Sequence, residues 1–217
     1  MVKSGRSNAR SRRAATLHWE ARKISRTHYT TAPADFNAGA ARPARPPFGY
    51  YGAKQRIARR IIQSLPPHHA WVEAFCGSAA LTLAKDPVPI EVINDLNGEI
   101  VNVFKQLRDN AEALCRAVAL TPYARAEFLD ARDRKDVDDS LERARVFLVK
   151  AMMAVNGTVG SHRCGFSFSP SYARDGQKAR VSRWYNLPDR LARVAERLRH
   201  VRVENRDARE ILQMFSD

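Results

Sequence analysis

The sequence contains few cysteines and no long apolar run. Its three cysteines, Cys76, Cys115 and Cys164, are far apart, so the sequence predicts neither a disulfide framework nor a metal site. No apolar run approaches the roughly 18 residues that a membrane span requires, and the first residues lack the apolar core of a secretory signal. We therefore expect a cytoplasmic protein without a membrane partner.

Acidic residues are also under-represented. Across the 217 residues, 37 lysines and arginines face 23 aspartates and glutamates, a net charge of +14. Residues 1–47 hold 10 basic and 2 acidic side chains, and residues 48–217 hold 27 and 21. A positive surplus in both parts favours a polyanionic partner, because each neutralised phosphate releases condensed counterions. An arginine-rich surface that only aids solubility is the alternative.

Two nucleotide-binding fingerprints are missing. No G-x-G-x-x-G follows a predicted strand, which weakens a nicotinamide oxidoreductase reading, and no P-loop sequence occurs. A measured binding of a nicotinamide cofactor would favour the oxidoreductase hypothesis again. An adenosine ligand that needs only one glycine turn and one acidic residue stays compatible with the sequence.

The chain divides by composition near residue 47. Residues 1–47 are rich in Arg, Ala, Ser and Thr and end in a proline-rich run, so they are predicted to be a disordered basic arm. Such an arm either grips DNA without specificity or is a dispensable extension. Beyond it, we expect strands at 70–75, 90–93 and 201–204, helices at 54–65, 78–84, 97–107, 111–120, 124–134, 140–155, 187–198 and 207–215, and an extended loop at 156–183. Ser140 is expected to cap the helix at 140–155.

The first strand, turn and helix form the opening of an α/β nucleotide-binding sheet. Gly77 after a buried strand lets a ligand approach the backbone, and Ser78 is expected to cap the following helix. Asp95 lies 18 residues after Gly77, at the end of the next predicted strand. A carboxylate there suits the two ribose hydroxyls of an adenosine ligand, although it equally suits a helix N-cap beside Asn97.

Four sequence segments together resemble the DNA adenine methylase family, especially its phage and prophage members. They run in order from about Phe48 to the last residue, with matching spacing. The segments are Tyr51-Gly-Ala-Lys54, Val72-Glu-Ala-Phe-Cys-Gly-Ser-Ala79, Asn94-Asp-Leu-Asn97 and Val203-Glu-Asn-Arg-Asp207. The resemblance implies an adenine-specific DNA methyltransferase that uses S-adenosylmethionine and double-stranded DNA in a bacterial or phage-infected cell.

The resemblance also implies roles for individual residues. Tyr51 and Lys54 match the motif that closes over the methionine end of the cofactor. Asp95 matches the acid on the ribose hydroxyls. The remaining cofactor-binding matches are the first-motif residues Glu73, Phe75, Gly77 and Ser78, and Asp207 and Ala208 beside the adenine ring.

The family's organisation places a target-recognition region between the second strand motif and the catalytic motif. We therefore expect a Rossmann-like methyltransferase sheet with a mostly helical inserted DNA-recognition lobe. Its parts are a cofactor-binding part at 48–119, the insertion at 120–190, and a return to the sheet at 191–217. Candidate DNA contacts are Arg163, Lys178, Arg180 and Arg183, and candidate stacking or packing aromatics are Phe166, Phe168, Tyr172 and Trp184.

The sequence departs from the family pattern in two ways. Ala74 and Ala79 replace a proline and a second glycine of the first motif, and a close ligand approach survives at Ala79 if that position is already helical. The family's catalytic Asp-Pro-Pro-Tyr is absent from the 217 residues. That tetrapeptide accepts hydrogen bonds from the adenine amine and stacks on the extruded base. The sequence thus predicts an incomplete sheet, no catalytic residue, and an inactive chain that a downstream fragment would complete. The alternative is a non-catalytic DNA-binding remnant.

Overall fold

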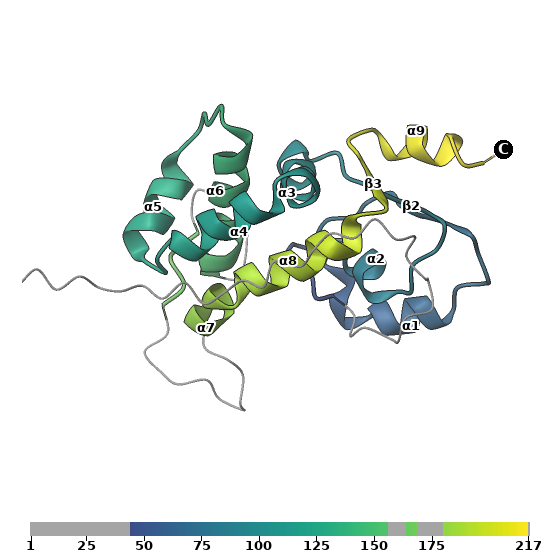
Figure 1. The fold of residues 1–217 in the computed structure, drawn as a ribbon, viewed down its shortest axis with the longest axis horizontal. Helices are drawn as coiled ribbons and strands as arrows, with labels where there is room; N and C mark the ends of the chain where they lie inside the picture. The colour runs from purple at the N-terminus through teal and green to yellow at the C-terminus, as the bar shows by residue number, and fades with distance from the viewer. Residues whose placement is uncertain (1–43, 156–163, 169–179, 217) are drawn as a thin grey trace, which may run out of the picture. The chain divides into compact units, whose positions relative to one another are not determined.

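The computed structural model describes residues 44–155, 164–168 and 180–216, all within one compact unit that spans Arg42–Asp217. The other unit, Met1–Ala41, lies outside the described residues, as does the predicted basic arm up to residue 43. Helices and strands alternate at the start of the described unit, helices follow, and a strand and a helix close it (Figure 1).

Three parallel strands form the sheet in the order β1-β2-β3 (Figure 1). They are β1 at Ala70–Glu73, β2 at Ile90–Asn94 and β3 at Val201–Glu204. Glu73 pairs with Ile93, and Ile93 pairs with Val203, so the carboxyl ends of all three strands meet at one edge. The mixed α/β class with a small parallel sheet is confirmed.

The described helices agree closely with the sequence pattern. Leu187, Leu191, Val194 and Leu198, spaced three and four apart, are all fully buried on α8. The helices are α1 Ala58–Gln63, α2 Ala80–Ala84, α3 Gly98–Asp109, α4 Ala111–Leu120, α5 Arg125–Asp133, α6 Ser140–Met153, α7 Arg180–Tyr185, α8 Leu187–Leu198 and α9 Ala208–Gln213.

The core lies where α3, α4, α6 and α8 pack together. α8 runs from beside α7, next to the α4–α6 group, to β3 at the sheet (Figure 1). Phe48 is 2% exposed and its ring contacts Phe104 of α3 and Phe147 of α6, which fixes the start of the described chain on this core. α8 therefore connects the helical part of the unit to the sheet, and it crosses the boundary that was expected between residues 190 and 191.

Four local predictions were wrong. The helix expected at 54–65 is a 3-10 turn at Lys54–Arg56 followed by α1, which ends at Gln63. Ser78 does not cap α2, because Ala79 is the N-cap residue and makes no side-chain cap bond. Ser140 does not cap α6, because the Asp139 carboxylate accepts from the Leu141 N–H. The loop expected to reach residue 183 ends earlier, since Arg180–Tyr185 is helical.

Candidate functional site

The turn after β1 lies at the carboxyl edge of the sheet. Gly77 has a φ of +50°, a left-handed conformation that favours glycine. A Cβ at Gly77 would lie 3.2 Å from the ring of Tyr50. The turn is held by hydrogen bonds from the Cys76 N–H to the Asn94 carbonyl, 2.8 Å, and from the Ala79 N–H to the Cys76 carbonyl, 2.7 Å. The backbone here accepts no side chain at Gly77.

Ala79 adopts the left-handed region as well, with a φ of +54°. The condition stated for a close ligand approach, that this position is already helical, is not met: Ala79 precedes α2 as its N-cap residue and is fully buried. The family's glycine fits this conformation without strain, whereas alanine adopts it at a cost of about 1–2 kcal/mol. The neighbouring Ser78 is 2% exposed, and its hydroxyl has no hydrogen-bond partner among the described residues.

Asp95 follows β2 and joins the first two strand ends. Its Oδ2 accepts from the Gly77 N–H at 2.8 Å, and its Oδ1 accepts from the Asn97 N–H at 3.0 Å. The N-cap of α3 is Asn97, whose side chain accepts from the Glu99 N–H at 3.0 Å. Asp95 is thus not the cap residue, and its half-buried carboxylate lies against the glycine turn.

Lys54 reaches the same turn from the 3-10 segment. Its Nζ donates to the Phe75 carbonyl at 3.1 Å, so the structure brings the first two sequence motifs together. Tyr51 and Phe75 are 89% and 70% exposed. Tyr50 instead packs its ring on Gly77, and its hydroxyl accepts from the Asn97 side-chain amide at 3.4 Å. Tyr50 is not among the residues predicted from the sequence, and only its position beside Tyr51 signals it.

Two asparagines that sequence reasoning also missed hold the strand ends in place. The Asn94 amide, 1% exposed, donates to the carbonyls of Ala74 and Arg206, both at 3.0 Å, and its oxygen accepts from the Arg206 N–H at 2.9 Å. The Asn205 amide donates to the Asp95 carbonyl at 2.7 Å. The signal was present, since both lie inside the motifs quoted above.

Asp207 and Ala208 follow β3 at the same edge. The Asp207 carboxylate caps α9 by accepting from the Arg209 N–H at 2.8 Å, and it also pairs with the Arg209 side chain. These bonds lower the pKa of Asp207. The bond from the Arg206 N–H to Asn94 brings this segment next to β2. The cofactor-binding residues expected from the sequence therefore gather around the ends of three strands.

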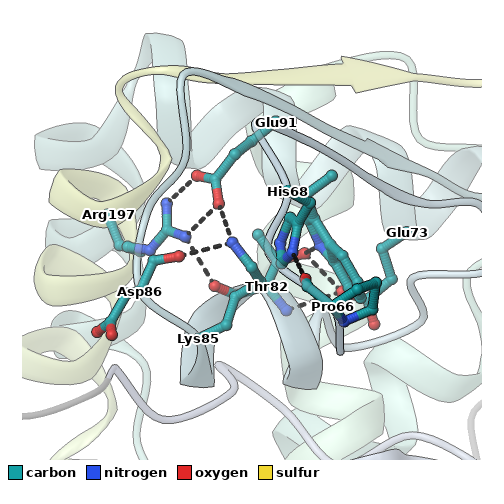
Figure 2. Close-up of polar contacts among 9 residues, drawn as sticks. Pro66, His68, Glu73, Thr82, Lys85, Asp86, Glu91 and Arg197 are labelled. Carbon is teal, nitrogen blue, oxygen red and sulfur yellow. Dashed lines mark hydrogen bonds and ion pairs between the residues drawn. The ribbon is translucent and has the colours of Figure 1, made fainter. Parts of the chain in front are cut away.

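Glu73 is a buried carboxylate at the end of β1, 4% exposed. Its Oε2 accepts from the Thr82 hydroxyl at 2.6 Å and from the Thr82 N–H at 3.0 Å. Its Oε1 is buried and has no partner among the described residues. Burial raises the pKa of Glu73, while the two bonds from Thr82 and the charge of Lys54 lower it. Figure 2 shows Glu73 and Thr82 side by side.

A buried ion cluster lies behind Glu73, with Glu91 between Lys85 and Arg197 (Figure 2). Lys85 Nζ lies 3.1 Å from Glu91 Oε1, and both side chains are at most 3% exposed. Arg197 of α8 donates to both oxygens of Glu91, and its Nη2 also donates to the Thr82 carbonyl at 2.9 Å. The cluster connects β2, α2 and α8.

Two of the four predicted DNA contacts can be placed. The Arg180 side chain donates to the Ala154 carbonyl at 3.3 Å, and Arg183 is exposed on α7. Arg163 and Lys178 lie outside the described residues, as does Tyr172. Two of the other predicted aromatics are packed and one is exposed. Trp184 is 1% exposed and donates to the Thr121 carbonyl, and Phe166 packs on Tyr123 and Phe128. Phe168 is 69% exposed.

An arginine cluster that sequence reasoning missed surrounds Arg190 of α8. Its guanidinium donates to the carbonyls of Arg183, 3.2 Å, and Pro46, 3.5 Å. Burial and the charges of Arg183, Arg45 and Arg193 lower the pKa of Arg190 to about 10. Within the described part of the chain, no carboxylate pairs with any of these four arginines. Arg45 and Arg190 are distant in sequence, so no local pattern indicates the cluster.

In residues 44–155, 164–168 and 180–216, no group of three or more His, Cys, Asp or Glu side chains is placed to hold a metal ion. None of the described helices is long and apolar enough to cross a membrane.

Comparison with known proteins agrees with this geometry. The family model for D12 class N6 adenine-specific DNA methyltransferases matches residues 50–216, which include all three strands and the glycine turn. The Type II methyltransferase M1.LlaDCHI of Lactococcus lactis subsp. cremoris is 30% identical over 123 residues. That match covers 52% of this chain and 42% of the relative, so the chain spans less than half of that protein. The chain belongs to the D12 class of N6 adenine-specific DNA methyltransferases.

Proposed function

We propose that residues 48–217 bind S-adenosylmethionine for the transfer of its methyl group to the exocyclic amine of adenine in DNA. The observation that carries the proposal is the hydrogen bond between the Gly77 N–H and Asp95, which joins the glycine turn and the acid at the edge of a parallel sheet. A ligand in a parallel α/β sheet binds outside the carboxyl ends of the strands.

The residues at this edge fit such a ligand. Gly77 carries no side chain in the turn after β1, and the ring of Tyr50 packs where its Cβ would lie. Each Asp95 oxygen accepts one backbone N–H and keeps a further lone pair for a ribose hydroxyl. Glu73 Oε1 and Ser78 Oγ are buried polar atoms without partners among the described residues, which favours a polar ligand close by.

The other assignments remain proposals with the same roles. Tyr51 and Lys54 close over the methionine end of the cofactor, and Glu73, Phe75 and Ser78 bind it as residues of the first cofactor motif. Asp207 and Ala208 lie beside its adenine. The packing of Tyr50 on Gly77 supports adding Tyr50 to this set. When bound, S-adenosylmethionine supplies an electrophilic methyl group, and the residues of this chain bind and orient it.

DNA recognition is proposed for residues 120–190, between cofactor-binding parts at 48–119 and 191–217. The exposed Arg183 and its neighbours Arg45, Arg190 and Arg193 support a phosphate-binding surface next to this region. Arg163, Lys178 and Arg180 stay candidate contacts. We further propose that methyl transfer requires an Asp-Pro-Pro-Tyr segment supplied in addition to these 217 residues. A radiolabel transfer assay in which the chain alone methylates DNA would contradict this.

Titration calorimetry with S-adenosylmethionine tests the cofactor proposal. The 217-residue chain is expected to bind, and Asp95→Ala to weaken binding about tenfold or more, because a hydrogen bond to a charged group contributes about 1.5–3 kcal/mol. Asp109→Ala, an exposed carboxylate at the end of α3, is the control and should leave affinity unchanged. Circular dichroism shows whether each variant folds. A folded parent chain that binds DNA but not the cofactor would favour the DNA-binding remnant.

A further inference from the structure

We propose that Thr82 is a positioning residue for the cofactor: its hydroxyl, oriented by the Trp71 indole, holds one oxygen of Glu73 so that the other faces the cationic amino group of S-adenosylmethionine. The inference rests on the proposed function, because it needs the cofactor bound at this edge of the sheet. Thr82 lies on α2 and belongs to none of the sequence motifs, so its role comes from the tertiary contacts (Figure 2).

The direction of each hydrogen bond follows from the chemistry of the groups. The Trp71 indole N–H, a donor only, lies 2.8 Å from the Thr82 hydroxyl oxygen. The Glu73 carboxylate, an acceptor only when ionised, lies 2.6 Å from that same oxygen. The hydroxyl therefore accepts from Trp71, and its single hydrogen points to Glu73. The Thr82 N–H adds a second bond to the same Glu73 oxygen, at 3.0 Å.

Both bonds from Thr82 reach Oε2, so Oε1 is left without a partner in the described residues. Glu73 is 4% exposed, and a buried carboxylate oxygen without a donor costs free energy. The charge of Lys54 and the backbone N–H of Leu81 lower the pKa of Glu73, but Lys54 directs its Nζ to the Phe75 carbonyl, and Oε1 has no hydrogen-bond partner among the described residues. A donor from a ligand would satisfy Oε1, and the cofactor's methionine end offers an ammonium group.

Thr82 is itself held from the opposite side. Arg197 Nη2 donates to the Thr82 carbonyl at 2.9 Å while the same guanidinium binds both oxygens of Glu91 (Figure 2). The ion cluster thus ties α2 to β2 and to α8. Because the backbone of Thr82 cannot shift freely, the orientation of Glu73 is fixed before any ligand arrives.

The arrangement also sets the pH range of binding. Burial raises the pKa of Glu73, and the bonds from Thr82 and the charge of Lys54 oppose that rise. Burial, together with the charges of Asp95 and Glu73, raises the pKa of the neighbouring Cys76, which therefore stays a neutral thiol. Binding of an ammonium needs ionised Glu73. Without the hydroxyl the pKa of Glu73 rises further. As the pH falls, Glu73 is then protonated earlier, so binding should be lost at a higher pH than in the parent chain.

The experiment compares two ligands that differ only in the amino-acid end. S-Adenosylhomocysteine carries the ammonium, and 5′-methylthioadenosine lacks it. Thr82→Val keeps the side-chain shape and removes the hydroxyl; it should bind S-adenosylhomocysteine about tenfold more weakly than the parent chain does and 5′-methylthioadenosine equally well. Thr82→Ser keeps the hydroxyl and should restore most of the affinity. As the pH is lowered from 8 to 5, Thr82→Val should lose its binding of S-adenosylhomocysteine at a higher pH than the parent chain does.

Trp71→Phe provides an independent variant if Thr82→Val does not fold. It removes the donor that orients the hydroxyl, and a smaller, few-fold loss for S-adenosylhomocysteine alone is expected. Equal losses for both ligands in a folded variant, or no loss in Thr82→Val, would overturn the positioning role. If the parent chain binds neither ligand, the proposed function fails instead, so the two failures are distinguishable.

Discussion

Gly77 and Ala79 show how two neighbouring residues of the same turn differ in what they tolerate. Both have a positive φ, near +50°, but only Gly77 faces an aromatic ring where a Cβ would lie. Ala79 already carries a Cβ, buried in the core. A side chain is thus opposed at Gly77 both by the backbone conformation and by Tyr50, whereas at Ala79 the backbone conformation alone opposes it.

Gly77→Ala is expected to destabilise the protein. The left-handed conformation costs an alanine about 1–2 kcal/mol, and the contact with Tyr50 adds to this. Denaturant unfolding measures the change in the free energy of unfolding. Gly49→Ala is the matched control, because no atom lies within 4 Å of a Cβ there and its φ is not in the left-handed region. A Gly77→Ala variant as stable as the parent would contradict the strained turn.

Ala79→Gly is the reverse comparison at the same turn. It removes the same strain, about 1–2 kcal/mol, but loses a buried methyl worth about 0.8 kcal/mol and frees the unfolded chain by about 0.4–1 kcal/mol. These contributions nearly cancel, so stability should stay within about 1 kcal/mol of the parent.

At the scale of elements, three parallel strands are joined at their ends through one side chain. Asn94 of β2 makes both donor bonds to carbonyls, one after β1 and one after β3, and its acceptor bond to the Arg206 N–H. An amide supplies this combination of two donors and an acceptor, and a carboxylate does not. The relative position of the segments that follow β1, β2 and β3 depends on this side chain.

Asn94→Asp should therefore be strongly destabilising although the two side chains have the same shape. The new carboxylate would face two carbonyl oxygens in a site that is 1% exposed. We expect a loss of about 2–4 kcal/mol in the free energy of unfolding, from unsatisfied and repelling polar groups. Asn102→Asp is the control, because Asn102 of α3 makes an exposed hydrogen bond to the Ser140 carbonyl. Its free energy of unfolding should fall by less than about 1 kcal/mol. Similar losses in both variants would argue against the joining role.

At the scale of the whole molecule, positive charge gathers where segments distant in sequence meet. Arg45 lies before the first helix, Arg183 on α7, and Arg190 and Arg193 on α8. Burial and the neighbouring like charges lower the pKa of Arg190, and a phosphate would relieve the repulsion among these charges. We propose this cluster as part of the DNA surface, which then extends beyond the region 120–190 that the sequence indicated, because Arg45 and Arg193 lie outside it.

The double variant Arg183→Gln, Arg193→Gln should bind double-stranded DNA more weakly and with less salt dependence. Each lost phosphate contact lowers the slope of log K against log salt by about 0.9. Fluorescence anisotropy over a series of salt concentrations measures that slope. Arg202→Gln, an exposed arginine on β3, is the single-charge control. If the slope of log K against log salt fell no further in the double variant than in Arg202→Gln, the cluster would not be a DNA-binding surface.

The sequence by itself determined the order of strands, turns and helices, because apolar spacing and Gly77 act locally. It also determined the family, since the motif residues keep their identity and spacing. Among the predicted site residues, Lys54 contacts the Phe75 carbonyl and Gly77 contacts Asp95, while their roles in cofactor binding stay predictions.

Only the tertiary structure decided which side chains support those motifs. Tyr50 rather than Tyr51 packs on the turn, Thr82 orients Glu73, and Arg197 crosses 106 residues of sequence to reach Glu91. Local patterns carry no information about such partners, because the contacts form between elements that the chain brings together only on folding. The same reason hides the arginine cluster, whose members come from three separate segments.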